Sequence, residues 1–445
     1  MDGRHIRVET PLQALMAEQA LVLAKQLEEV AAAAPHGKVL ARLEQAAVAG
    51  GREFVRASLE QALQVQAADV EKTSSARLCS CGHRRRHKGG SPRNVLTAAG
   101  HVRVKRVYFT CPRCHSGEYA LDAHLGIEGH VSPQARRLLC LAGASWSFAL
   151  AEQRLAEFCG LQTSNFTIRE VCQSEGAAML QWQRESDAAH QPFVKATGDI
   201  EFTTDGTSVN TMEGWREMKI GIFSKRQRAE FATPEQWADR LLPQPHVRLA
   251  FVAIETADRF SSRWRHWMTR LGIRQSSQIS VLADGARWIW DRARLLFPDA
   301  TGVLDIYHGV EHVAGTAKKL YGEETPEATA WTDDGRKALL HGGWPELEMQ
   351  LAAAQQTHVR PSEQGSLADL RGYFVPHQDH LNYRQRLAEG RSIGSGIVEG
   401  AAKNLVGKRL KQTGARWRVR RVNRMGGLCA CIYSDHWETY WANAA

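Results

Sequence analysis

The sequence predicts a multidomain α+β protein, in which three small N-terminal regions precede one larger domain. The chain has 445 residues, which is more than a typical single domain contains. Residues 11–72 have the apolar periodicity of helices, whereas residues 73–125 combine two close cysteine pairs with strand-like alternation. From about residue 195, apolar strand-like segments are followed by a long helical region.

Composition narrows the class of protein. Hydrophobic residues make up 43% of the chain, and the formal net charge is +9, which favours a polyanionic partner such as nucleic acid. No apolar run approaches the roughly 20 residues of a membrane span. The first residues, "MDGRHIRVETPLQ", have no apolar signal core, so we expect a cytoplasmic protein without a membrane partner. The nine cysteines are then expected to be reduced thiols or metal ligands rather than disulfides.

The first region, residues 1–72, is expected to be helical. The stretch "LQALMAEQALVLAKQLEEVAAAA" is rich in strong helix formers. It predicts a helical bundle or a dimerisation element.

The second region, residues 73–125, is predicted to be a zinc-ribbon-like module. Two close pairs can hold one ion tetrahedrally, and the expected ligands are Cys79, Cys81, Cys111 and Cys114. Because Cys-x-Cys chelates less comfortably than Cys-x-x-Cys, His83, His87 or His115 could replace one cysteine, and thiols without metal are a further alternative. The neighbouring Arg84, Arg85 and Arg86 are expected to bind a phosphate backbone.

The third region, residues 130–185, is predicted to be helix-turn-helix-like. Ser132 before Pro133 begins one helix, Gly160 ends another, and Thr163 or Ser164 begins a third. A generic helical packing unit is the alternative interpretation.

The fourth region, residues 195–445, contains two strand-like segments that lead into Asp-Gly, "FTTDGTSV" and "LADGARWIW". We expect each aspartate to end its strand, with the glycine allowing the chain to turn. Asp205 and Asp284 would then present carboxylates at the sheet edge. Such oxygen ligands suit Mg²⁺ or Mn²⁺.

A third carboxylate is needed for two metal ions about 4 Å apart, and Glu399 is the candidate. It lies on an expected helix, where Lys403 shares its face; a routine surface ion pair is the alternative. The cations expected to contact DNA here are Lys403, Lys408, Arg409, Lys411 and Arg416. Trp417 could stack on a base or pack in the core.

Four ordered motifs resemble the bacterial insertion-sequence transposases of the ISKra4 family and, more distantly, Mutator and IS256 transposases. They lie at residues 203–221, 282–290, 303–313 and 393–411. The resemblance implies a ribonuclease-H-like α/β catalytic core with a DDE triad of Asp205, Asp284 and Glu399. The helical pattern at about 309–388 would be an all-helical insertion, in which Trp331 or Trp344 could stack on a displaced base.

The relatives also carry a Cys/Asp-x-x-His element, which here runs from Asp305 to His308. We assign His308 to the catalytic site, with a structural hydrogen bond as the alternative role. Their usual Cys-x-x-Cys in the first half of the zinc site is replaced here by Cys-x-Cys.

The resemblance implies cleavage at transposon ends and transfer of the 3′-hydroxyl into target DNA, with two Mg²⁺ or Mn²⁺ ions and a structural Zn²⁺. The expected partners are double-stranded terminal inverted repeats, target DNA and a second copy of the chain or a higher oligomer. The protein would be nucleoid-associated. The competing functions are a non-catalytic, domesticated DNA-binding regulator and a ribonuclease-H-like nuclease without strand transfer.

Overall fold

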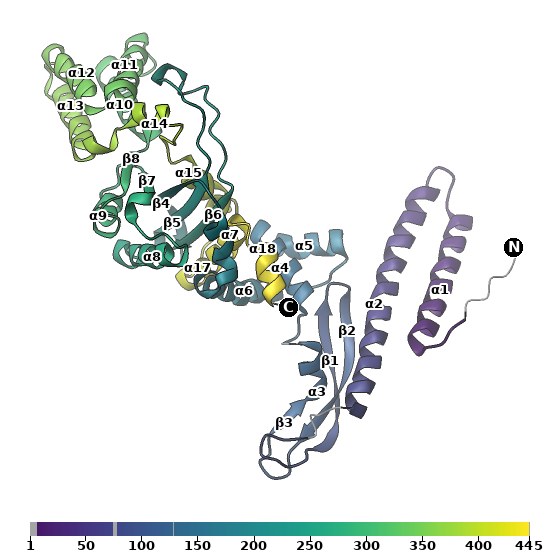
Figure 1. The fold of residues 1–445 in the computed structure, drawn as a ribbon. Coiled ribbons are helices and arrows are strands. Elements are labelled where there is room, and N and C mark those ends of the chain that lie inside the picture. Colours follow the sequence, from purple (N-terminus) through teal and green to yellow (C-terminus); the bar gives the residue numbers. More distant parts are fainter. Residues whose placement is uncertain (1–6, 74–77, 128, 445) are drawn as a thin grey trace. The chain divides into compact units, whose positions relative to one another are not determined.

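The computed structural model describes residues 7–73, 78–127 and 129–444. The chain divides into two compact units, one ending at Cys172 and one spanning Gln173–Asn443 (Figure 1). Both units contain helices and a sheet, so the α+β prediction is confirmed. Within the described ranges, no helix is both long enough and apolar enough to cross a membrane.

The first unit begins with two helices that pack against each other, α1 (Pro11–Ala33) and α2 (Val39–Thr73). A capping box fixes the start of α1, because the Thr10 hydroxyl accepts from the backbone N–H of Gln13 and the Gln13 side chain accepts from that of Thr10. None of the residues of α1 is buried. The helix is therefore held mainly by α2 and by its own propensity.

A three-stranded antiparallel sheet follows, with the order β1-β2-β3. Val102 and Val104 are buried, whereas Arg103 and Lys105 between and after them are exposed, which is the alternation the sequence predicted. The apolar face packs against α2. The bounds are β1 (Arg86–Thr97), β2 (Gly100–Thr110), β3 (Gly117–Tyr119) and the following α3 (Ala120–Leu125).

Helices then continue to the boundary between the units. Ser132 caps the first of them by accepting from the backbone N–H of Ala135 at 3.2 Å, as the sequence indicated. Gly160, with φ of +66°, ends the second helical segment. The bounds are α4 (Pro133–Ser145), α5 (Phe148–Arg154), the π-helical η2 (Leu155–Cys159) and α6 (Asn165–Glu185).

The second unit is built on a five-stranded mixed sheet with the order β6-β5-β4-β7-β8. β4 pairs antiparallel with β5 and parallel with β7, so the first strand of the unit is central. The bounds are β4 (Asp199–Thr211), β5 (Gly214–Arg226), β6 (Val247–Ala253), β7 (Ile279–Ala283) and β8 (Thr301–Leu304).

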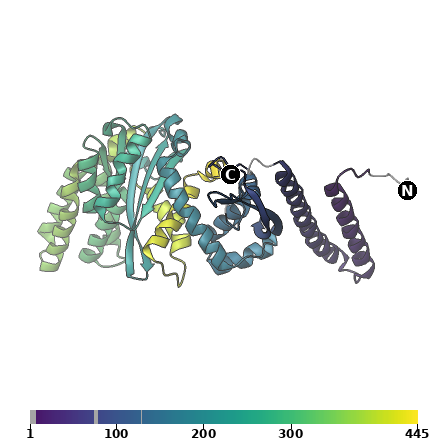
Figure 2. The ribbon, with the colours of Figure 1, turned by 90° about the horizontal axis from the view of Figure 1, so that it is seen from below.

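Helices cover both faces of this sheet (Figure 2). On one face, Phe202, Phe223 and Phe251 pack with Trp264 and Phe297 in the core. On the other, α17 lies against β6, where Val252 approaches Gly426. The bounds of the helices in this part of the unit are α7 (Asp187–Lys195), α8 (Ala257–Arg270), α9 (Arg287–Leu296), α15 (Gly396–Ala401), η6 (Ala402–Gly407), α16 (Lys408–Leu410), α17 (Val419–Tyr433) and α18 (Trp437–Ala444). Short 3-10 turns occur at η3 (Pro234–Gln236) and η4 (Ser276–Gln278).

A cluster of helices separates β8 from α15, drawn in green in Figure 1. Its members are α10 (Ile306–Tyr321), α11 (Pro326–Gly342), α12 (Trp344–Thr357), α13 (Pro361–Phe374), the 3-10 segment η5 (Val375–His380) and α14 (Tyr383–Ala388). The all-helical segment predicted at about 309–388 is therefore present. Its apolar side chains join the core of the sheet domain.

Candidate active site and metal centre

Asp205 lies inside β4 and not at its end, which corrects the sequence prediction. The strand continues through Gly206 to Thr211, and Asp205 pairs with Ile220 of β5. Side chains alternate along a strand, so Thr203, Asp205 and Thr207 share one face. Lys411 donates to the Thr207 hydroxyl, which places the segment after η6 on this face.

Asp284 directly follows the last residue of β7, as predicted. The parallel strands β4 and β7 pair through Thr203 and Leu282, so Asp205 and Asp284 each come two residues after a member of that pair. Asp205 lies within β4 and Asp284 just beyond β7, at the same distance from that pair. The Asp284 carboxylate accepts from the backbone N–H of Ala286 at 3.0 Å, which fixes the turn into α9.

The two aspartates interact electrostatically. Burial raises the pKa of Asp205, a hydrogen bond from the N–H of Gly206 opposes this, and the negative charge of Asp284 raises the pKa further. His308 also lies close enough to lower it. A half-buried carboxylate beside a like charge is a site where a cation would be stabilising.

The glycines after the two aspartates serve close packing and not an unusual backbone conformation. Neither is among the glycines with positive φ. A Cβ on Gly206 would lie 2.1 Å from the Glu217 carboxylate, and one on Gly285 would lie 2.3 Å from the Tyr373 ring. The turn that the sequence predicted at Gly206 is absent because β4 continues there.

Asp305 is a buried carboxylate with four hydrogen bonds. It caps α10 by accepting from the backbone N–H groups of Tyr307 at 2.7 Å and His308 at 3.3 Å. Its other oxygen accepts from the backbone N–H and the hydroxyl of Ser395, each at 2.5 Å. Asp305 therefore joins the start of α10 to the residue that precedes α15.

His308 lies in the first turn of α10, beside the aspartates. Its Nδ1 is 3.3 Å from the Glu311 carboxylate, and 43% of its side chain is exposed. It also lowers the pKa of His312, although burial is the main cause of that shift. His308 is thus near the predicted site, with one ring nitrogen directed to Glu311.

Glu399 lies on α15, which packs against β4 and β5. Its carboxylate accepts from Lys403 at 2.7 Å, and 62% of its side chain is exposed. The oxygens of Asp205, Asp284 and Glu399 do not form a group within 4.8 Å of one another, a criterion that only four cysteines meet among the described residues. The helix that carries Glu399 is adjacent to β4, but in this structure the glutamate is paired with lysine.

The cations predicted to contact DNA differ in exposure. Arg85 forms an ion pair with Glu118 at 2.6 Å, and the buried Arg409 lies 5.0 Å from the ring centroid of Trp417. The others are exposed, namely Arg84, Arg86, Lys403, Lys408, Lys411 and Arg416.

The three tryptophans considered for base stacking are packed in the protein. Trp417 is buried and donates to the carbonyl of Leu410 at 3.0 Å. Trp331 is buried, and Trp344 packs against the core next to Phe374. Each ring is therefore used in packing.

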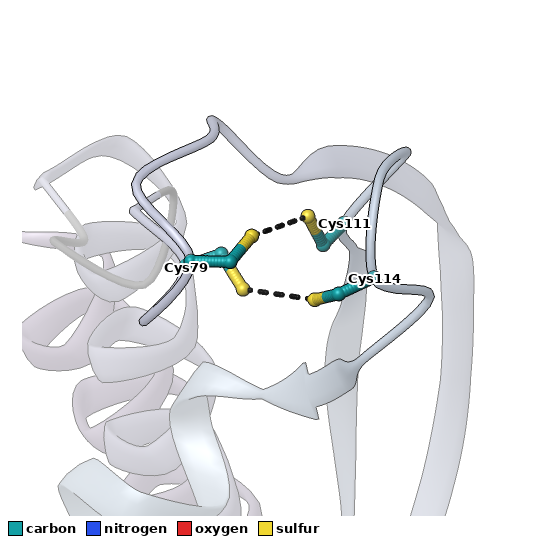
Figure 3. A group of neighbouring side chains, drawn as sticks. Cys79, Cys111 and Cys114 are labelled. Carbon is teal, nitrogen blue, oxygen red and sulfur yellow. Dashed lines mark hydrogen bonds between the residues drawn. The ribbon is translucent and has the colours of Figure 1, made fainter.

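The four predicted zinc ligands come together in the first unit (Figure 3). Their sulfur atoms all lie within 4.8 Å of one another. Cys79 is 3.3 Å from Cys114, and Cys81 is 3.5 Å from Cys111. A tetrahedral zinc ion with Zn–S bonds of about 2.3 Å needs sulfurs about 3.8 Å apart. The cluster could therefore bind a metal such as zinc.

Hydrogen bonds favour thiolates at Cys79 and Cys114. At Cys81 a backbone contact with His83 lowers the pKa, but the neighbouring thiols Cys111 and Cys79 and burial outweigh it and raise the pKa to about 12. A hydrogen bond from the backbone of Cys81, with further bonds from Ser116 and Cys114, lowers the pKa of Cys79 to about 5. The Ser116 hydroxyl is also the main cause of a lowered pKa at Cys114. The histidines considered as substitutes lie outside the four-sulfur group, with His83 directed to the carbonyl of Cys81 at 3.2 Å.

Three residues near the aspartates were not assigned from the sequence. Glu217 and the buried Lys219 pair with each other on β5, on the side of Gly206. Tyr373 of α13 covers Gly285 and stacks on His312 at 3.7 Å between ring centroids. The alternation in "GWREMKIG" indicates that Glu217 and Lys219 share a face, but no local pattern indicates Tyr373.

Comparison with protein-family models and with curated proteins gave no match for this chain.

Proposed function

We propose that the protein is a DDE-type DNA transposase, similar to the ISKra4 insertion-sequence family, with a ribonuclease-H-like catalytic core. One observation carries the proposal. Asp205 and Asp284 each come two residues after the paired Thr203 and Leu282 of adjacent parallel strands, and the helix of Glu399 packs against the strand of Asp205.

Carboxylate oxygens are ligands that suit divalent cations. Asp205 is half-buried and has a raised pKa, caused by burial and by the charge of Asp284. Asp205, Asp284 and Glu399 would hold Mg²⁺ or Mn²⁺, with Glu399 exchanging its contact with Lys403 for the metal. When bound, such ions lower the pKa of a water or a 3′-hydroxyl and stabilise the leaving oxygen of an in-line displacement.

The remaining residues bind and orient the DNA strand. Lys408, Lys411 and Arg416 are exposed and would neutralise backbone phosphates. His308 stays close to Asp205 and orients groups at the reacting centre. Asp305 maintains the position of Ser395 and hence the start of the helix of Glu399.

The cysteine cluster would hold a structural Zn²⁺, and Arg84 and Arg86 beside it would contact the terminal inverted repeats. Two or more copies of the chain would assemble on double-stranded DNA to bring the transposon ends together. We place this assembly at the nucleoid.

The test is incubation of the full chain with Mg²⁺ or Mn²⁺ and a duplex that carries the terminal repeat flanking its gene. Strand-transfer products support the proposal. Nicking without transfer indicates a nuclease, and a mobility shift without cleavage indicates a DNA-binding regulator. Asp284→Asn should abolish both chemical steps and retain binding, so continued cleavage by this variant contradicts the assignment.

A further inference from the structure

A pocket of about 370 Å³ opens in the second unit, next to the Asp305–Ser395 contact. Tyr307, Gly394 and Gly396 form its wall on that side. Pockets of about 300–1,000 Å³ are typical of small-molecule sites. This one is large enough for a ligand with a ring and a charged group.

Three arginines line the pocket, Arg226, Arg240 and Arg248, and none of its described lining residues is acidic. Arg226 forms an ion pair with Glu201 at 2.9 Å, and Arg248 lies 3.3 Å from Asp435. Arg240 donates to the carbonyl of Arg391 at 2.7 Å, and no ion pair joins it to a carboxylate in the described part of the chain.

A half-buried guanidinium without a carboxylate partner is costly unless an anion accompanies it. Burial accordingly lowers the pKa of Arg240, and the charge of Arg226 adds to this effect, whereas Tyr307 and Glu201 oppose it. The pocket is therefore complementary to an anion. Guanidinium groups match phosphate oxygens through paired hydrogen bonds.

Aromatic side chains stand beside the arginines. The rings of Trp237 and Tyr307 are 5.6 Å apart and inclined at 46°, and 57% of Tyr307 is exposed. Arg248 lies 4.3 Å from the ring centroid of Tyr433. Aromatic faces of this kind stack on nucleobases without strong sequence preference.

We propose that this pocket binds one nucleotide of a DNA strand, with the phosphate at Arg240 and Arg248 and the base against Tyr307 and Trp237. The strand as the source of the nucleotide rests on the proposed function. The pocket shares Gly396, Ile397 and Gly400 with the helix of Glu399. An occupied pocket would therefore hold the strand against the helix that carries Glu399.

The test measures binding of a deoxydinucleotide, a deoxynucleoside monophosphate and inorganic phosphate to the full chain by calorimetry. The dinucleotide should bind most tightly. Arg240→Met should weaken its binding about tenfold or more, as expected for loss of a charged hydrogen bond. The matched control is Arg274→Met, which removes the same charge from an exposed position outside the pocket and should change affinity less than twofold.

Other results would overturn the proposal. Equal affinity for inorganic phosphate and dinucleotide indicates a simple anion site. Tighter binding of the monophosphate indicates that the natural ligand of the pocket is a free nucleotide and not a nucleotide within a DNA strand. Equal losses in the two methionine variants indicate nonspecific surface charge.

A second variant tests the pocket without removing the half-buried Arg240. A Cβ on Gly400 would meet no side chain or other segment within 4 Å, and Gly400 lines the pocket, so Gly400→Leu directs a larger side chain from an open position of this lining. It should weaken dinucleotide binding, and unchanged binding contradicts the proposal. The binding assay involves no cleavage, so the two proposals can fail separately. If the protein binds the dinucleotide but cannot cleave DNA, the proposed function is rejected and the proposed nucleotide pocket stands.

Discussion

The carboxylate of Asp305 ties together two segments that are 90 residues apart, by accepting both the N–H and the hydroxyl of Ser395. The same carboxylate caps α10. Asp305 thus fixes the position of Ser395, the residue that precedes the helix of Glu399, although a long helical segment separates the two in sequence. It is a positioning residue, since its oxygens are already occupied by protein donors.

Asp305→Asn should therefore destabilise the second unit. The asparagine NH₂ group would face donors of Ser395 or of the α10 N-terminus, and the charge-assisted bonds would be lost. We expect a loss of about 2–3 kcal/mol in the free energy of unfolding, measured by urea titration. A double-mutant cycle with Ser395→Ala should give coupling of about 1 kcal/mol or more. Strict additivity would contradict the contact.

Asp205→Asn should have the opposite effect on stability. The substitution removes a half-buried charge that Asp284 repels, so the metal-free protein should become more stable. The expected gain is about 1 kcal/mol, or roughly 2–4 °C in melting temperature. Asp369→Asn, at an exposed position on α13, is the control for the change in net charge and should have little effect.

Comparison of the unaltered protein with Asp205→Asn also tests metal binding. Millimolar Mg²⁺ should raise the melting temperature of the unaltered protein, because a ligand that binds only the folded state stabilises it. Asp205→Asn should lose this increase and all cleavage activity. An equal Mg²⁺-dependent increase in both proteins would show that the ion binds elsewhere.

Local patterns in the sequence predicted much of this architecture. The alternation of Val102 and Val104 with basic residues indicated a half-buried strand, and "ISVLA" before Asp284 indicated a fully buried one. Helical periodicity also located the segment between β8 and α15. These features depend on neighbours in sequence, where spacing and burial are directly linked.

Contacts between distant residues were not predictable in this way. Gly206 was interpreted as a turn, whereas the structure places it inside β4 beside Glu217 of the adjacent strand. The Asp305–Ser395 contact and the cover of Gly285 by Tyr373 arise from tertiary packing. The sequence also gave no sign that Arg85 and Arg409 would find partners within the protein.

Removal of zinc should disrupt the first unit locally. We expect one zinc per reduced chain by elemental analysis and less than half of that in Cys81→Ser, because a tetrahedral site needs all four ligands. A chelator should reduce protection from proteolysis around β1–β3. Cys159→Ser changes an exposed thiol outside the cluster and serves as the control. Full zinc content in Cys81→Ser would reject the four-cysteine site.

Acid should destabilise the second unit through His436. Burial lowers the pKa of His436 to about 4 from its ordinary 6.5, and the positive charge of His190 adds to this. The unfolded chain therefore binds more protons than the folded one between these values. Stability is complete above pH 6.5 and falls as the pH decreases toward 4. Between pH 7 and pH 5, the loss from this group is about 2 kcal/mol.

His436→Gln should remove about that much of the pH dependence in urea titrations at the two pH values. His190 and His377, which also have lowered pKa values because of burial, would continue to contribute. His246→Gln, at an exposed position in the same unit, should leave the dependence unchanged. The assignment is contradicted by identical pH dependence in the His436→Gln variant and the unaltered protein, because a buried neutral imidazole must charge when the unit unfolds in acid.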